Sequence, residues 1–175
     1  MTQRKPVVVV MGVSGCGKST IGQMLASRLG FDFLEGDDFH SLPNVEKMKS
    51  GMPLNDSDRR DWLGALAERI RQTRQQGRSA VVSCSALKRA YRDVLRIAAP
   101  DLLLVHLVGD FTLLQQRISG RAGHYMPASL LQSQFLDLQV PQTDEHALSV
   151  PVDLPPEKIL ASIASAFDNL KPFRP

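Results

Sequence analysis

The sequence of 175 residues contains two cysteines, one tryptophan and no long apolar run. Two cysteines, Cys16 and Cys84, cannot supply a disulfide framework or a four-ligand zinc site. The longest apolar runs, Val7–Met11 and Leu102–Val105, fall far short of the roughly 20 residues that cross a bilayer. We expect no secretory signal, because no apolar segment with a small-residue cleavage site follows the first residues. These absences exclude a membrane-spanning protein, a disulfide-rich secreted domain and a zinc module.

An excess of charge of one sign is also missing, since 21 Lys and Arg stand against 18 Asp and Glu, a net charge of +3. Such a small excess gives no argument for a nucleic-acid partner. The charge is unevenly distributed, because residues 59–96 carry ten basic and three acidic side chains, a balance of +7 that leaves −4 elsewhere. This stretch indicates either an anionic ligand nearby or, at least for four of its arginines, a solvated helix face: Arg69, Arg71, Arg74 and Arg78.

Short apolar runs alternate with segments of helical periodicity along the chain. The expected strands are Val7–Met11, Phe31–Leu34, Ala80–Cys84, Leu102–Val108 and Ser149–Val152. The expected helices are Lys18–Leu29, Ser57–Gln76, Leu87–Ala98, Phe111–Ser119, Ala128–Leu138 and Pro156–Leu170. Residues 39–55 are expected to be irregular, with at most a short helix at Val45–Lys49. The alternation predicts a three-layer α/β fold, a five-stranded parallel sheet with helices on both faces and ligands beyond the carboxyl ends of the strands.

The first loop, between an expected strand and an expected helix, fits the pattern G-x-x-x-x-G-K-[ST]. Its glycines let successive backbone N–H groups converge on phosphate oxygens, which side chains would obstruct. Lys18 places a positive charge at the β- and γ-phosphates, and the hydroxyl of Ser19 reaches Mg²⁺. The loop therefore predicts a phosphate-binding P-loop for ATP, made of Gly12, Val13, Ser14, Gly15, Cys16, Gly17, Lys18, Ser19 and Thr20.

Three acidic residues, Glu35, Asp37 and Asp38, follow the second expected strand. Acids beside a phosphate site are costly unless a cation or a proton transfer uses them. In an extended segment Glu35 and Asp37 would point to the same side. We interpret Asp37 as the base that receives the proton of an acceptor hydroxyl and Glu35 as a ligand of the Mg²⁺ shell. The alternative is that these acids cap turns. We interpret His40 as a structural hydrogen-bonding residue in preference to a catalyst.

Two arginines four residues apart, Arg117 and Arg121, lead into a charged loop that contains glycine. Arginine donors in a closing segment can neutralise the charge of a transferring phosphoryl group. We therefore expect one P-loop domain over residues 1–175, with an acceptor-binding insertion at about 38–76 and a lid at about 117–130. The alternative for the two arginines is an ordinary basic helix end.

Several longer runs of this sequence are more distinctive than the P-loop. They are Gly36–His40, Asn44–Met48, Gly51–Leu63, Cys84–Asp93, Gly123–Pro127 and Leu130–Phe135. In these runs the sequence resembles the small P-loop gluconokinases, and the likeness extends from about Val7 to Asp153.

The resemblance implies ATP- and Mg²⁺-dependent phosphorylation of D-gluconate at its 6-hydroxyl, in a nucleoside-monophosphate-kinase-like fold with a lid. It implies a cytoplasmic homodimer, with neither nucleic acid nor membrane as a partner. The catalytic residues it implies are Asp37, Lys18 and Arg121. Arg117 would stack on adenine, Arg121 would contact the phosphates, and Ser19 and Glu35 would serve the metal. The substrate-binding residues we expect are Asp37, His40, Arg59, Lys88, Arg92 and His124.

Three other classes of protein share parts of this pattern. A shikimate or nucleoside monophosphate kinase has the same P-loop context, and an assay with each acceptor distinguishes it. A GTPase-type switch or a nucleotide-binding adaptor is a second alternative. Residues 61–64 match D-x-x-G inside an expected helix, but the sequence has no N-K-x-D motif. A nucleic-acid binder, the third, would show steep salt dependence and more exposed aromatic side chains.

Overall fold

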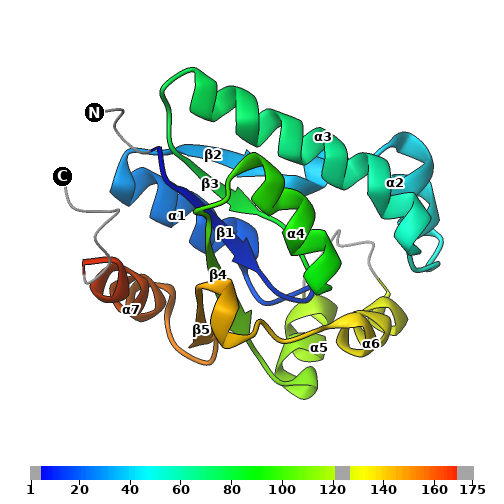
Figure 1. Cartoon of the computed structure of the whole chain (residues 1–175). Helices are drawn as coiled ribbons and strands as arrows, with labels where there is room; N and C mark the ends of the chain where they lie inside the picture. The colour runs from blue at the N-terminus through cyan, green and yellow to red at the C-terminus, as the bar shows by residue number, and fades with distance from the viewer. Residues whose placement is uncertain (1–4, 121–126, 169–175) are drawn as a thin grey trace.

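The computed structural model describes residues 5–120 and 127–168, in which five strands form one parallel sheet (Figure 1). The strands are β1 (Val7–Met11), β2 (Asp32–Glu35), β3 (Ala80–Ser83), β4 (Leu103–Val108) and β5 (Ala147–Pro151). Their order across the sheet is β2-β3-β1-β4-β5, and every neighbouring pair is parallel. In the centre, Val9 lies opposite Val82 on one side and Leu104 on the other. The predicted parallel α/β fold is confirmed.

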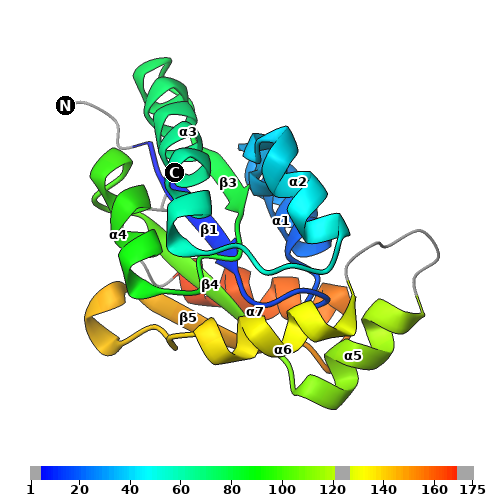
Figure 2. The same cartoon turned by 90° about the vertical axis from the view of Figure 1, so that its right-hand side faces the viewer.

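Helices cover both faces of the sheet. They are α1 (Lys18–Leu29), α2 (Leu42–Lys49), α3 (Asp56–Gln75), α4 (Arg89–Ala98), α5 (Phe111–Ser119), α6 (Ala128–Asp137) and α7 (Pro156–Asp168). Two short 3-10 segments, η1 (Gly36–Phe39) and η2 (Thr143–Glu145), follow β2 and precede β5. Helices α3 and α4 pack on one face and α1 and α7 on the other (Figure 2). Helices α2, α5 and α6 gather beyond the carboxyl end of β1, on the right of Figure 1.

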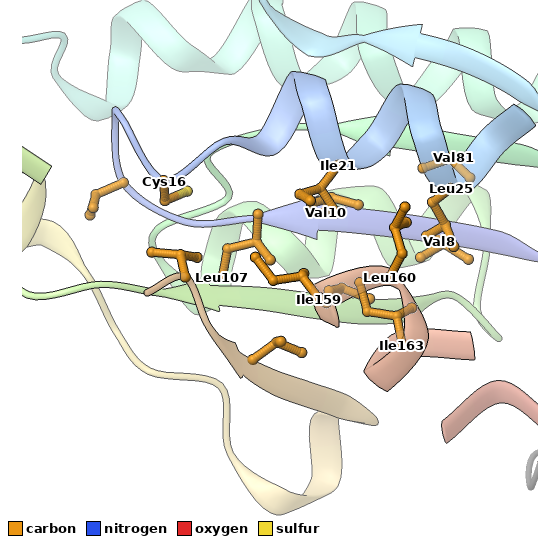
Figure 3. Packing of buried hydrophobic residues seen from close by; sticks show 14 of the residues in the cluster. Val8, Val10, Cys16, Ile21, Leu25, Val81, Leu107, Ile159, Leu160 and Ile163 are labelled. Carbon is orange, nitrogen blue, oxygen red and sulfur yellow. The ribbon is translucent and has the colours of Figure 1, made fainter. Parts of the chain in front are cut away.

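Strand β1 is buried along its whole length, because both of its faces meet a helix layer. Val8 and Val10 belong to the same cluster as Leu25 of α1 and Ile163 of α7 (Figure 3), whereas Val9 belongs to the cluster of Ile70 in α3. Each fully buried aliphatic side chain stabilises the fold by about 1.5–3 kcal/mol relative to exposure. The unbroken β-branched run therefore makes β1 the rigid support of the loop that follows it.

The segment that was expected to be mostly irregular holds a longer helix than predicted. Helix α2 begins at Leu42, because Ser41 caps it by accepting a hydrogen bond from the backbone N–H of Asn44. Pro43 lies in the first turn, where its missing N–H costs nothing, so it starts this helix and does not interrupt it. The fifth strand also begins two residues earlier than predicted, at Ala147.

The predicted insertion at 38–76 divides into two parts in the structure. Helix α3 belongs to the layer that covers the sheet, since Leu66 and Ile70 are fully buried there, while η1 and α2 lie beyond the strand ends. The predicted lid at 117–130 starts on α5 and ends on α6, and its residues 121–126 lie outside the described residues, as does Leu170 of the last predicted helix. No helix within the described ranges is long and apolar enough to cross a membrane.

Candidate active site

The loop between β1 and α1 adopts a conformation that depends on its glycines. Gly12, Gly15 and Gly17 have φ angles of 145°, 80° and 93°, values that side chains disfavour. A Cβ at Gly12 would also lie 2.8 Å from the carbonyl oxygen of Leu107. Gly17 is the N-cap of α1 and no side chain caps this helix start. Backbone N–H groups at an uncapped helix start suit a phosphate, so the loop fits the nucleotide predicted for it.

The side chains of this loop face different surroundings. Lys18 Nζ donates to the carbonyl oxygen of Val13 at 3.2 Å, and the N–H of Ser14 donates to Gln134 Oε1 at 2.7 Å. Ser19 and Thr20 are exposed, whereas Cys16 is buried in the core cluster (Figure 3). The lysine and the Ser19 hydroxyl are therefore available at the loop's surface, and Cys16 contributes packing and a backbone group.

A cavity of about 250 Å³ begins at this loop. It is lined by Ser14 and Lys18 of the P-loop, Asp37 of η1, Val45 and Met48 of α2, Arg59 and Trp62 of α3, and Leu130, Ser133 and Gln134 of α6, together with His40, Pro53, Leu54 and Ser85 from the segments between these elements. The structure thus brings together five of the predicted site residues, Ser14, Lys18, Asp37, His40 and Arg59. Apolar walls with a few convergent polar groups are typical of a small-molecule site.

The two acids expected to share one side of an extended segment do not do so. Residues 36–39 form the 3-10 segment η1, so the alternation that would pair Glu35 with Asp37 is absent. Glu35 accepts a hydrogen bond from Ser83 Oγ and does not line the cavity. Asp37 does line it, with 74% of its side chain exposed. The expectation that Glu35 and Asp37 share one side was therefore wrong, although Asp37 still lines the cavity.

Arg59 is a second cation of the cavity wall beside Lys18, and its side chain is only 9% exposed. Its Nη1 donates to Tyr91 Oη at 3.0 Å and to Asp137 Oδ2 at 3.3 Å. Lys88 stands just outside the cavity lining, where its Nζ donates to Asp56 Oδ1 at 2.9 Å. Hydrogen bonds from Tyr91 and from Lys88 lower the pKa of the Asp56 carboxyl. The two cations therefore alternate with two carboxylates, since Asp137 lies near both Arg59 and Lys88 and Asp56 pairs with Lys88.

The structure corrects the assignment of Arg92 to substrate binding. Its side chain is 1% exposed and holds Glu145 with two hydrogen bonds, Nε to Oε1 at 2.6 Å and Nη2 to Oε2 at 2.9 Å. Its Nη1 donates to the carbonyl oxygens of Ala86 and Leu87, both at 3.0 Å. Ala86 has a left-handed φ of 44°, so these bonds hold a strained loop. Arg92 fixes the segment that carries Ser85 to the cavity, and it does not reach the cavity itself.

Arg117 lies on α5. Arg117 Nη2 donates to the carbonyl oxygen of Val152 at 2.6 Å, which ties α5 to the segment after β5. Arg121 and His124 lie outside the described residues. His40 is stacked on Trp62 with ring centroids 4.1 Å apart, and burial lowers the pKa of this histidine more than the nearby Asp37 raises it.

Sequence reasoning missed the contribution of α6. Gln134 lines the cavity, and its Oε1 accepts a hydrogen bond from the backbone N–H of Ser14. Helix α6 therefore connects the wall of the cavity to the P-loop. The signal was present, because Gln134 stands four residues after the buried Leu130 and therefore on the inner face of the same helix.

Comparison with known proteins now gives this site its context. A protein-family model described as an AAA domain matches residues 7–141. The probable gluconokinase of Rattus norvegicus is 42% identical over 178 residues, which cover 91% of this chain and 96% of that protein. An unliganded sugar kinase from Janibacter sp. HTCC2649 has a TM-score of 0.91 at 42% identity and covers 98% of this chain and 99% of its own. A gluconokinase from Sinorhizobium meliloti 1021 has a TM-score of 0.83 at 43% identity, covering 95% of each chain.

The parallel sheet, the glycine loop with its lysine, and the cavity that joins this loop to an exposed carboxylate define a P-loop kinase of small molecules. Within that class, the identity to gluconokinases over nearly the whole chain is decisive. The chain belongs to the gluconokinase family.

Proposed function

We propose that the chain transfers a phosphoryl group from ATP to the 6-hydroxyl of D-gluconate and releases 6-phospho-D-gluconate. The observation that carries this proposal is that a single cavity contains the P-loop lysine, an exposed carboxylate and a buried arginine: Lys18, Asp37 and Arg59. Phosphoryl transfer needs these three functions, namely phosphate binding, a proton acceptor and a group that positions the acceptor. In a sugar acid, the carboxylate is the group that such a positioning residue would bind.

The phosphate side of the cavity belongs to the P-loop. Its N–H groups and the ammonium of Lys18 bind and orient the phosphates. ATP supplies the γ-phosphoryl group, and Mg²⁺ would neutralise part of its charge. Within the described residues no cluster of three or more His, Cys, Asp or Glu forms a cage for a metal. This agrees with how Mg²⁺ is usually held, by few protein ligands together with phosphates. Ser19, exposed at the start of α1, and Glu35 would hold it.

The acceptor side of the cavity has two tasks. Asp37 receives the proton of the 6-hydroxyl on its carboxylate, which is accessible because the side chain is mostly exposed. Arg59 binds the carboxylate of the sugar acid, for which a planar guanidinium is well suited. His40, the residue after η1, also lines the cavity and offers a ring nitrogen to a substrate hydroxyl.

Other parts of the proposal come from the family resemblance. Arg117 stacks on adenine, Arg121 contacts the phosphates within a lid at 117–130, and His124 contributes to acceptor binding. Lys88 adds positive potential at the edge of the cavity. The protein acts as a homodimer in the cytoplasm, on D-gluconate, with neither nucleic acid nor membrane as partner.

A coupled assay of ADP release tests the reaction with gluconate, shikimate, AMP or no acceptor. We expect turnover with gluconate and only background in the other three arms. Turnover with shikimate or AMP instead would reassign the acceptor. Absence of turnover in every arm, with ATP still bound, would favour a nucleotide-binding adaptor.

Replacing the proposed base tests the acceptor side. Asp37→Asn should lower kcat at least about 100-fold, since a general base typically contributes 10²–10⁴-fold. The melting temperature and the KM for ATP should stay near those of the wild type. Asp38→Asn is the matched control, because Asp38 is an exposed neighbour that does not line the cavity. Equal kcat values for the two variants would move the base elsewhere.

A further inference from the structure

The side chain of Asp37 makes few contacts of its own. It is 74% exposed, and the nearest charged or titratable group that contacts it among the described residues is His40, with Nε2 3.9 Å from Oδ1. A side chain with so little packing does not fix its own position. The place of the carboxylate must therefore come from the backbone of η1.

That backbone is held from two directions at Gly36. Its N–H donates to Ser83 Oγ at 3.3 Å, and its carbonyl oxygen accepts from Trp62 Nε1 at 2.7 Å. The strand side is in close contact, because a Cβ at position 36 would lie 2.1 Å from the carbonyl oxygen of Ser83. Gly36 thus lies between β3 and the indole of Trp62, directly before the proposed base.

Trp62 also holds the residue that follows η1. Its ring stacks on His40 with centroids 4.1 Å apart and planes at 17°. The His40 side chain is 5% exposed and its Nδ1 has no hydrogen-bond partner among the described residues, so packing against Trp62 supports it. One buried tryptophan therefore contacts both ends of the segment that carries Asp37.

We propose that Trp62 is the positioning residue for the base Asp37: its N–H bond to Gly36 and its stack on His40 set where the carboxylate meets the acceptor hydroxyl. This inference rests on the proposed function. A displacement of about 1 Å between reacting groups can cost 100-fold in rate, so one lost hydrogen bond at Gly36 should be visible in kcat. The N–H, and not only the volume of the ring, carries the effect.

The chain contains a single tryptophan, which makes a selective test available. Biosynthetic replacement of tryptophan by benzothienylalanine changes position 62 alone; it keeps the fused ring and replaces the N–H by sulfur. We expect kcat with gluconate to fall about 10- to 100-fold, with the KM values for gluconate and ATP changed less than about threefold. Trp62→Phe should show the same loss of kcat with a larger loss of stability.

The control is Ile70→Val, a change of one methyl group in the same helix and the same buried cluster. It should lower the melting temperature by about 2–4 °C and leave kcat unchanged. A benzothienylalanine protein with wild-type kcat would overturn the proposal, as would an equal fall of kcat in Ile70→Val. If the unsubstituted protein fails to phosphorylate gluconate, the proposed function is wrong. If the unsubstituted protein phosphorylates gluconate and the benzothienylalanine protein does so at the same rate, only the role of Trp62 is wrong.

Discussion

Arg59 and Arg92 belong to the same basic stretch, and each is buried beside a carboxylate, yet they have different surroundings. Arg92 is paired through two nitrogens with Glu145 and through the third with two backbone carbonyls. Both hydrogen bonds of Arg59 to described residues leave from Nη1, and the longer one reaches Asp137 at 3.3 Å. Arg59 also borders the cavity. Burial and charge therefore do not distinguish the two arginines; completeness of pairing does.

The difference has an energetic basis. Removing two charges from water costs several kcal/mol per ion, which a buried pair recovers only with good geometry and satisfied donors. Arg92 and Glu145, both 1% exposed, meet that condition and gain nothing from an incoming ligand. Among the described residues Nε and Nη2 of Arg59 make no hydrogen bond, so under the proposed function they would bind the carboxylate of a substrate. A sugar acid would thus complete a pairing that the protein leaves unfinished.

The largest effect should follow from breaking the complete pair. Arg92→Met leaves Glu145 buried without its partner, which should destabilise the fold by about 3–5 kcal/mol in urea unfolding. Replacing both residues, Arg92→Met with Glu145→Leu, should recover most of the loss because no buried charge remains. A stable Arg92→Met protein with a strongly raised gluconate KM would reverse the roles of the two arginines.

Removal of the incompletely paired arginine should affect binding more than folding. Arg59→Ala should raise the gluconate KM about 10- to 100-fold, since hydrogen bonds to charged groups contribute about 1.5–3 kcal/mol. The KM for ATP should stay nearly unchanged, because the P-loop binds the nucleotide. Arg60→Ala, at the exposed next position, is the matched control in the steady-state assay. A shift of the ATP KM instead would show that Arg59 serves the nucleotide.

Acid should weaken the complete pair. Burial acts to raise the pKa of Glu145, but hydrogen bonds from Arg92 and from the backbone N–H of Gln142 outweigh it and hold this pKa below its usual value. The pair's contribution to stability is then fully present above the unfolded-state pKa of about 4.3 and is lost as pH falls through the folded value.

We therefore expect Glu145→Gln to be less stable than the wild type at neutral pH and to lose less additional stability below about pH 4. Thermal unfolding of both proteins across pH 3–7 measures this difference. Parallel curves for the two proteins would mean that Glu145 is not the titrating group.

The sequence predicted the fold and the place of the glycine loop between β1 and α1, and physical reasons explain where it failed. Local signals encode β1 and the P-loop, since a β-branched run, three glycines and Lys18 stand side by side. The partner of Arg92 lies 53 residues away at Glu145, and no periodicity connects them. Likewise, η1 forms because Gly36 packs against β3 and Trp62, which are tertiary contacts that an alternating pattern of acids cannot reveal.

The smallest effect should come from Lys88, which is more exposed than either arginine. Its side chain is 27% exposed, and it pairs with Asp56, itself 70% exposed, so solvent screens the ion pair and it contributes little to stability. Lys88→Met keeps the apolar stem and removes the charge, and the gluconate KM should rise by less than about fivefold with kcat unchanged. The rise in KM should become smaller as the salt concentration increases, because salt screens the attraction between an exposed charge and a distant anion. If the gluconate KM rose as much as in Arg59→Ala and did not depend on salt, Lys88 would contact the carboxylate of the sugar acid directly. Completeness of pairing would then not be enough to tell which cations bind the substrate.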